Sequence, residues 1–91
     1  MNKTLSDLRK EIDDIDDKLI ELLESRMACS CEVAVYKKNN GLPVDMPERE
    51  NEIIQKIKDS VKEEYFDSIK EIYIKIITQS KKIQELIIGA K

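Results

Sequence analysis

The sequence predicts an all-α fold of three helices, the first of them very long. Only two glycines and two prolines occur in 91 residues, which leaves little room for the many turns of a β-fold. Apolar residues recur at spacings of three and four, which is the period of a helix that packs along one side. A chain of this length is expected to form one domain, residues 1–91.

The first helix is predicted over about residues 6–38. Its apolar seam consists of Leu5, Leu8, Ile12, Ile15, Leu19, Leu22, Arg26, Cys29, Val33 and Tyr36, with Arg26 as the charged exception. Thr4 or Ser6 can cap its start, and Asn39-Asn40-Gly41 can end it. Such a helix spans about 50 Å, whereas a compact chain of this size has a diameter of about 30 Å. Because the helix outruns that globule, we expect a homodimer in which a second chain buries its far end.

Two shorter helices are predicted over about residues 47–62 and 66–88, after an extended linker at 41–48. Asp45 with Glu48 resembles a capping box for the second helix, and Pro47 suits its first turn. A break is expected within residues 62–66, and Gly89 is expected to end the third helix. The apolar faces consist of Ile53, Ile54, Ile57 and Val61 on the second helix, and Ile69, Ile72, Tyr73, Ile76, Ile77, Ile83 and Ile87 on the third.

Composition argues against several classes of protein. Sixteen Lys and Arg against nineteen Asp and Glu give a net charge of -3, unlike the basic face of a nucleic-acid-binding module. Histidine is absent, which removes the commonest general base and zinc ligand. Cys29 and Cys31 are expected to be semi-buried free thiols. No signal peptide or run of about 18 apolar residues is apparent, so we expect a cytoplasmic protein without a membrane span.

Charged residues interrupt the apolar seam of the first helix. Arg26 stands on the seam itself, where it serves as a register-setting polar residue, as a buried ion-pair partner of a glutamate, or as a ligand for an anion. Lys37 lies eleven residues later on nearly the same face, so the two cations could hold the ends of a small dianion. Arg9 lies about 25 Å before Arg26 along the helix and could join that site only from a second, antiparallel chain. Otherwise Arg9 is a solvated flank residue.

Polar residues also occur on the other two helices. Ser80 and Gln84 share the apolar stripe of the third helix, where they either bond to a neighbouring helix or contact a ligand. Arg49 and Glu50 stand in the first turn of the second helix. The resulting set is rich in cations, with no nucleophile beside a base. It suits a doubly anionic small molecule and chemistry by orientation and electrostatic stabilisation.

In order and spacing, these residues resemble the all-helical class of chorismate mutases over nearly the whole chain. The matching segments are Leu8-Arg9 with Ile12, Ile15-Asp16, Leu19 to Leu23, Arg26, Glu32-Val33-Ala34 with Lys37, Pro43-Val44, Pro47-Glu48-Arg49-Glu50, and Ile77 through Ser80 to Gln84. The resemblance implies an intertwined homodimer that rearranges chorismate, a dianion, to prephenate on the route to phenylalanine and tyrosine. Such a reaction needs no cofactor and no metal.

The resemblance also implies a role for each site residue. Arg26 and the partner's Arg9 would bind the two carboxylates of chorismate, and Ser80 would meet one of them. Lys37 and Gln84 would donate to the ether oxygen. The remaining residues would hold the ring hydroxyl (Glu50), support that contact (Arg49) and wall the pocket (Val33 and Ile77).

Met46 departs from the family pattern, because many members carry an aspartate there that helps to bind the hydroxyl. This substitution keeps open a sibling activity, isochorismate pyruvate-lyase, although Glu50 favours the mutase. A catalytically silent helical dimerisation module is the alternative of a different class. It accounts for the seam but not for Arg26, Ser80 and Gln84 on buried stripes.

Overall fold

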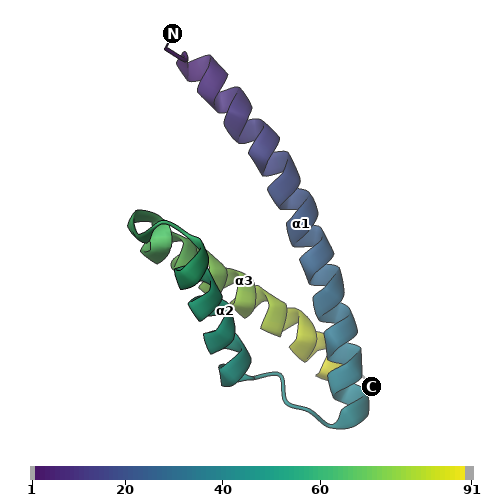
Figure 1. Ribbon diagram of the computed structural model, residues 1–91. Helices are drawn as coiled ribbons and strands as arrows, with labels where there is room; N and C mark the ends of the chain where they lie inside the picture. Colours follow the sequence, from purple (N-terminus) through teal and green to yellow (C-terminus); the bar gives the residue numbers. More distant parts are fainter. Residues whose placement is uncertain (1, 90–91) are drawn as a thin grey trace.

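A computed structural model describes residues 2–89, and in that range the chain forms the three predicted helices (Figure 1). They are α1 (Leu5–Asn40), α2 (Pro47–Ser60) and α3 (Glu63–Gly89). The third helix packs against both of the others and is therefore the central element of the fold. The all-helical class and the very long first helix are confirmed. No helix within the described residues is both long and apolar enough to cross a membrane.

Both ends of α1 are fixed by local hydrogen bonds. Thr4 is the N-cap: its Oγ1 accepts from the Asp7 N–H at 3.1 Å, and the Asp7 carboxylate accepts from the Thr4 N–H at 3.0 Å. Both bonds lower the pKa of Asp7, and the bond from the Thr4 backbone N–H has the larger effect. At the other end Gly41 adopts a left-handed conformation with φ of 63°, and its N–H donates to the Lys37 carbonyl. The predicted cap at Thr4 and the predicted stop at Gly41 are both confirmed.

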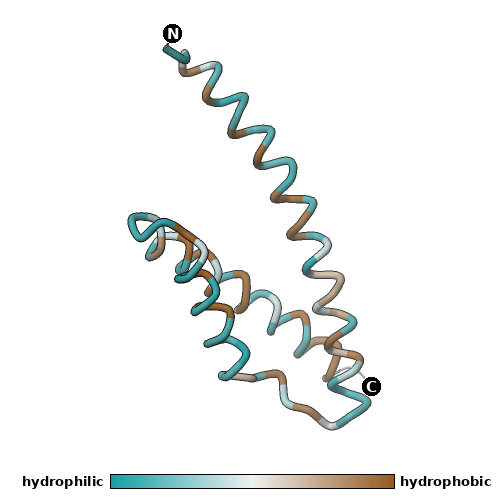
Figure 2. Tube along the Cα trace, in the orientation of Figure 1, coloured by the Kyte–Doolittle hydropathy of each residue, from teal (hydrophilic) through white to brown (hydrophobic). Residues whose placement is uncertain are grey.

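The N-terminal half of α1 projects away from the other two helices (Figure 1). The chain is 58 Å long with a radius of gyration of 16.8 Å, whereas a compact chain of 91 residues would have about 12 Å. Figure 2 shows hydrophobic segments recurring along this half, where no other helix lies beside it. The exposed apolar residues there are Leu5, Leu8, Ile12, Ile15, Leu19, Ile20 and Leu22.

The C-terminal half of α1 packs against α3, but not through the predicted seam. The buried residues are Ser30, Ala34 and Lys37. Cys29 and Val33, which the seam includes, remain exposed because they lie one residue earlier and thus about 100° around the helix. The expectation that Cys29 is semi-buried is therefore wrong for the single chain, whereas Cys31 is half-buried.

The start of α2 differs from the predicted capping box. Met46 is the N-cap residue, and it makes no side-chain cap bond. Asp45 lies one residue before the cap position, and its carboxylate pairs with Lys81 of α3. Pro47 opens the helix as expected, and the N–H groups of Arg49 and Glu50 donate to the Met46 carbonyl.

The break between α2 and α3 lies earlier than predicted, at residues 61 and 62. Val61 has an extended backbone and closes α2, its N–H donating to the Ile57 carbonyl at 3.1 Å. The third helix then begins at Glu63, and the acidic residues Glu63 and Glu64 in its first turn interact favourably with the helix dipole. It continues through Gly89, the last residue described.

Candidate functional site

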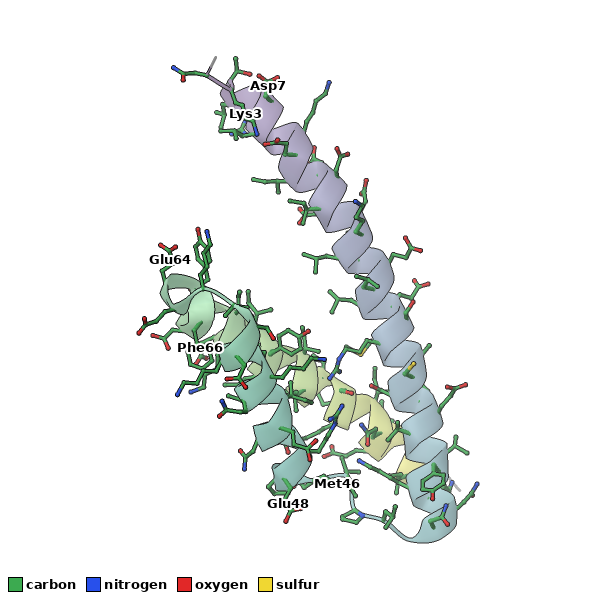
Figure 3. The ribbon with its side chains drawn as sticks, viewed as in Figure 1. Lys3, Asp7, Met46, Glu48, Glu64 and Phe66 are labelled. Carbon is green, nitrogen blue, oxygen red and sulfur yellow. The ribbon has the colours of Figure 1, made fainter. Side chains whose placement is uncertain are left out.

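A cavity of about 150 Å³ lies where α1, the 41–46 linker, α2 and α3 meet. One of its lining residues is Met46, which Figure 3 labels at the point where the linker joins α2. The lining residues are Arg26, Val33, Lys37, Val44, Met46, Arg49, Glu50, Ile53, Ile77, Ser80 and Lys81. Seven of the nine residues singled out from the sequence, all but Arg9 and Gln84, therefore surround one hollow.

Lys37 and Gln84 form a buried polar pair beside this cavity. They are 7% and 8% exposed. Lys37 Nζ donates to Gln84 Oε1 at 2.8 Å and to the Val44 carbonyl at 3.1 Å. Gln84 is thus held through its carbonyl oxygen, which leaves its amide N–H groups available as donors. An ammonium has three N–H groups, so Lys37 also keeps one to offer.

A second polar contact joins α1 and α3 through two buried hydroxyl groups. Ser30 Oγ donates to the Arg26 carbonyl at 3.1 Å and forms a hydrogen bond with Ser80 Oγ. The interhelical alternative for Ser80 therefore holds in this structure, although Ser80 also lines the cavity. Sequence reasoning missed Ser30. Its position, four residues after Arg26 and seven before Lys37, could have revealed it as a polar residue on the buried face.

The two arginines of the cavity differ in their partners. Arg26 is half-buried, and its guanidinium has no acidic partner within residues 2–89. Arg49 is exposed and pairs with Glu52 at 3.0 Å. Such a surface pair contributes only about 0.2–1 kcal/mol, so Arg49 can turn toward a ligand at little cost. The ion-pair interpretation of Arg26 is therefore not supported among these described residues.

Glu50 faces the cavity in an ion pair with Lys81, a residue that sequence reasoning missed. Lys81 Nζ lies 3.0 Å from Glu50 Oε1 and 2.9 Å from Asp45 Oδ1. The hydrogen bonds to Asp45 and then to Glu50 raise the pKa of Lys81. The available signal was its position four residues after Ile77, on the side of α3 that faces the cavity.

The electrostatic character of the cavity is strongly positive. Four cations line it (Arg26, Lys37, Arg49 and Lys81), against one carboxylate, Glu50. Positive charges in a partly enclosed site attract anions more strongly than the same charges on an open surface. Among residues 2–89, no group of three or more His, Cys, Asp or Glu is arranged to hold a metal ion. The arrangement can bind a small dianion and stabilise negative charge that develops beside Lys37.

Arg9 lies outside the cavity of its own chain. It is exposed on the projecting half of α1, about 25 Å along the helix from Arg26. A second hollow, of about 350 Å³, lies between α2 and α3 and shares Arg26, Arg49 and Ile53 with the first. A larger hollow of about 750 Å³ follows α2, but every residue lining it is exposed.

Comparison with known proteins gives consistent matches. Residues 8–85 match the family described as chorismate mutase type II. A chorismate mutase of Methanocaldococcus jannaschii is 37% identical over 67 residues, which are 74% of this chain and 68% of that protein. A bifunctional chorismate mutase/prephenate dehydratase of Aquifex aeolicus is 36% identical over an alignment of 96 residues, covering 96% of this chain.

The chain spans only part of the longer relatives, 26% of the Aquifex aeolicus protein. A T-protein of Haemophilus influenzae is 42% identical over 53 residues, which are 58% of this chain and 14% of that protein. No solved structure matches the chain significantly.

Proposed function

The chain belongs to the chorismate mutase type II family, and we propose that it rearranges chorismate to prephenate in the cavity between Arg26 and Lys37. The observation that carries this proposal is the buried Lys37–Gln84 pair at the edge of a cation-rich cavity, in a chain of this family. In the reaction one C–O bond of the enolpyruvyl ether breaks while one C–C bond forms in the same molecule. No proton is transferred, so the site has no need of a general base.

Lys37 and Gln84 are the proposed donors to the ether oxygen, where negative charge develops as the C–O bond breaks. The bond from Lys37 to Gln84 Oε1 turns the Gln84 amide N–H groups away from Lys37 and leaves them free to donate. The third N–H of Lys37 is also free. Because these groups are fixed before the substrate arrives, they stabilise the transition state without reorganising.

The two carboxylates of chorismate are the proposed partners of the arginines. Arg26 has no acidic partner within residues 2–89, which suits a guanidinium that binds a ligand carboxylate. Ser80 lines the cavity beside it and can turn its hydroxyl from Ser30 to the same carboxylate. Arg49 supports the rim, while Val33 and Ile77 supply apolar walls.

The second arginine comes, in this proposal, from another copy of the chain. The exposed apolar residues along the N-terminal half of α1 need a cover, and the hollow between α2 and α3 adjoins the cavity. In an intertwined homodimer the projecting half of α1 would lie across that hollow, and the partner's Arg9 would reach the substrate. Each site would then be completed by both chains.

Glu50 is the proposed acceptor for the ring hydroxyl. Met46 lines the same wall and offers no carboxylate, so Glu50 is the one acid in direct reach among the lining residues. Met46 is also the observation that favours a second candidate, isochorismate pyruvate-lyase. The retained Glu50 favours the mutase.

The test is to supply the purified protein with chorismate and, separately, with isochorismate, and to identify the products. Prephenate from chorismate is the expected result. Salicylate and pyruvate from isochorismate, without prephenate, would replace the mutase by the lyase. Turnover of neither compound would contradict both activities and leave a helical dimerisation module.

A further inference from the structure

Lys81 joins three segments of the chain at the cavity, and none of the proposed roles uses it. Its ammonium group bonds to Glu50 of α2 at 3.0 Å and to Asp45 of the linker at 2.9 Å. Lys81 and Glu50 are each 28% exposed, so this pair is shielded from solvent far more than Asp45, which is exposed. A partly buried pair is screened less by salt than a surface pair.

The ion pair leaves Glu50 with one oxygen held and one free. Lys81 contacts Oε1, and no other protein group within the described residues bonds to the Glu50 side chain. An ionised carboxylate accepts at both oxygens, so Oε2 remains able to accept a hydrogen bond from a hydroxyl group in the cavity. Without Lys81, the carboxylate could rotate toward Arg49 or Arg26, which line the same hollow.

We propose that Lys81 is the positioning residue of the hydroxyl subsite. It holds Glu50 by Oε1 so that Oε2 faces the substrate, and through Asp45 it fastens the end of the linker beside Met46. This inference rests on the proposed function. In this arrangement Lys81 is a fixed cation behind Glu50, the acid that binds the hydroxyl. Asp45 does not line the cavity, but it supports Glu50 indirectly by holding Lys81.

Because position 46 carries a methionine, the orientation of Glu50 by Lys81 matters more for binding the hydroxyl group. The side chain at position 46 lines the cavity but has no acceptor to offer a hydroxyl group, so recognition falls on a single carboxylate. A single acceptor must be oriented by its surroundings, because a lone glutamate side chain has several rotamers. Lys81 is the group in contact with it that can supply that orientation.

The test compares Lys81→Met with Lys82→Met, which removes an equal charge from the next, exposed position. The contact between Glu50 and the ring hydroxyl is made in both the substrate complex and the transition state. Weakening that contact therefore raises KM rather than lowering kcat. We expect Lys81→Met to raise KM for chorismate about tenfold, the effect of a hydrogen bond to a charged group, with kcat within about twofold. Lys82→Met should match the wild type. A purely structural role predicts the reverse, a lower apparent kcat with an unchanged KM.

Two further variants show whether Lys81 acts through Glu50. In a Glu50→Gln background, Lys81→Met should change KM by less than about twofold, because the group that it positions is already lost. Lys81→Arg, which keeps the charge and the reach, should restore most of the wild-type KM. If Lys81→Met gives no folded protein, Lys81→Gln is read in the same way.

The possible failures are distinct. An active wild type in which Lys81→Met and Lys82→Met behave alike, or in which the effects of Lys81→Met and Glu50→Gln simply multiply, would overturn the role of Lys81 and leave the proposed function intact. A wild type that makes no prephenate would overturn both.

Discussion

The two halves of α1 carry similar apolar patterns in different surroundings. In the C-terminal half Ala34 is fully buried and Lys37 nearly so, because α3 covers that face. In the N-terminal half Ile12 is 55% exposed and no part of the described chain covers it. The first half is packed within the described residues, whereas the second presents apolar side chains that those residues leave uncovered. A site that used both halves of α1 would therefore need packing within the chain at one end and a further contact at the other.

The largest effect is expected in the C-terminal half of α1, from removing Gln84, the hydrogen-bond partner of Lys37. Gln84→Ala deletes both the acceptor of the Lys37 bond and a proposed donor to the ether oxygen. Loss of one such donor lowers kcat by about a hundredfold to a thousandfold. Steady-state kinetics with chorismate would measure it, with Gln79→Ala on the exposed side of α3 as the control. Unchanged turnover would refute the role given to Gln84.

The role of the N-terminal half of α1 as a dimer interface can be tested by placing a charge on its apolar seam. Ile12→Glu should dissociate the proposed homodimer, because burying an isoleucine contributes about 1.5–3 kcal/mol for each chain. Ile20→Glu is the matched control, since Ile20 is 64% exposed but lies off the seam. Sedimentation over a dilution series should show at least a hundredfold weaker association for Ile12→Glu only. Equal association of both variants would show that the seam does not form the interface.

The two halves can also be tested together, since Arg9 lies on one and Arg26 on the other. Arg9→Ala and Arg26→Ala should each be inactive, but mixed chains should form hybrid dimers with one intact site. Random exchange makes half of the dimers hybrid, so about a quarter of the wild-type activity should return. An assay before and after subunit exchange measures this. Activity that stays at the level of the separate variants would contradict a site shared between chains.

The smallest expected effect concerns the cap of the uncovered half. A lowered pKa means that folding favours the ionised form of Asp7, so its stabilisation is present above the unfolded pKa of 3.8 and is lost as pH falls through the folded value. Asp7→Asn should therefore lower the thermal midpoint slightly at neutral pH and not at about pH 2. Asp13→Asn, farther along the same helix, is the control. An equal loss at both pH values would rule out the charged cap.

Much of this organisation could be predicted from sequence because it depends on local chemistry. Thr4 and Gly41 mark the ends of α1 through hydrogen bonds within a few residues, and periodicity places Lys37 and Gln84 on buried faces. Periodicity says less about which side of a helix a particular neighbour covers. The seam therefore included Cys29, whereas α3 covers the face of Ser30.

The features that were missed depend on contacts between distant segments. Asp45 was expected to cap α2, but a lysine 36 positions later competes for its carboxylate, and only the fold brings the two together. Lys81 has the residue type of an ordinary exposed helix position, so its role beside Glu50 follows from packing rather than from pattern. In the proposed homodimer, the position of Arg9 relative to the site depends on a second chain, which one sequence implies only through helix length.

The bond from Lys37 to the Val44 carbonyl has a consequence for how this linker can vary. Every residue carries a backbone carbonyl, so Lys37 recognises where the chain passes rather than which side chain it carries. Substitutions at Leu42 or Val44 keep the acceptor in place. An insertion or deletion between Gly41 and Val44 would instead move it, and would shift the register of everything that follows, Asp45 and Met46 first. The bond to Lys37 thus constrains the length of the 42–44 segment and not its side chains.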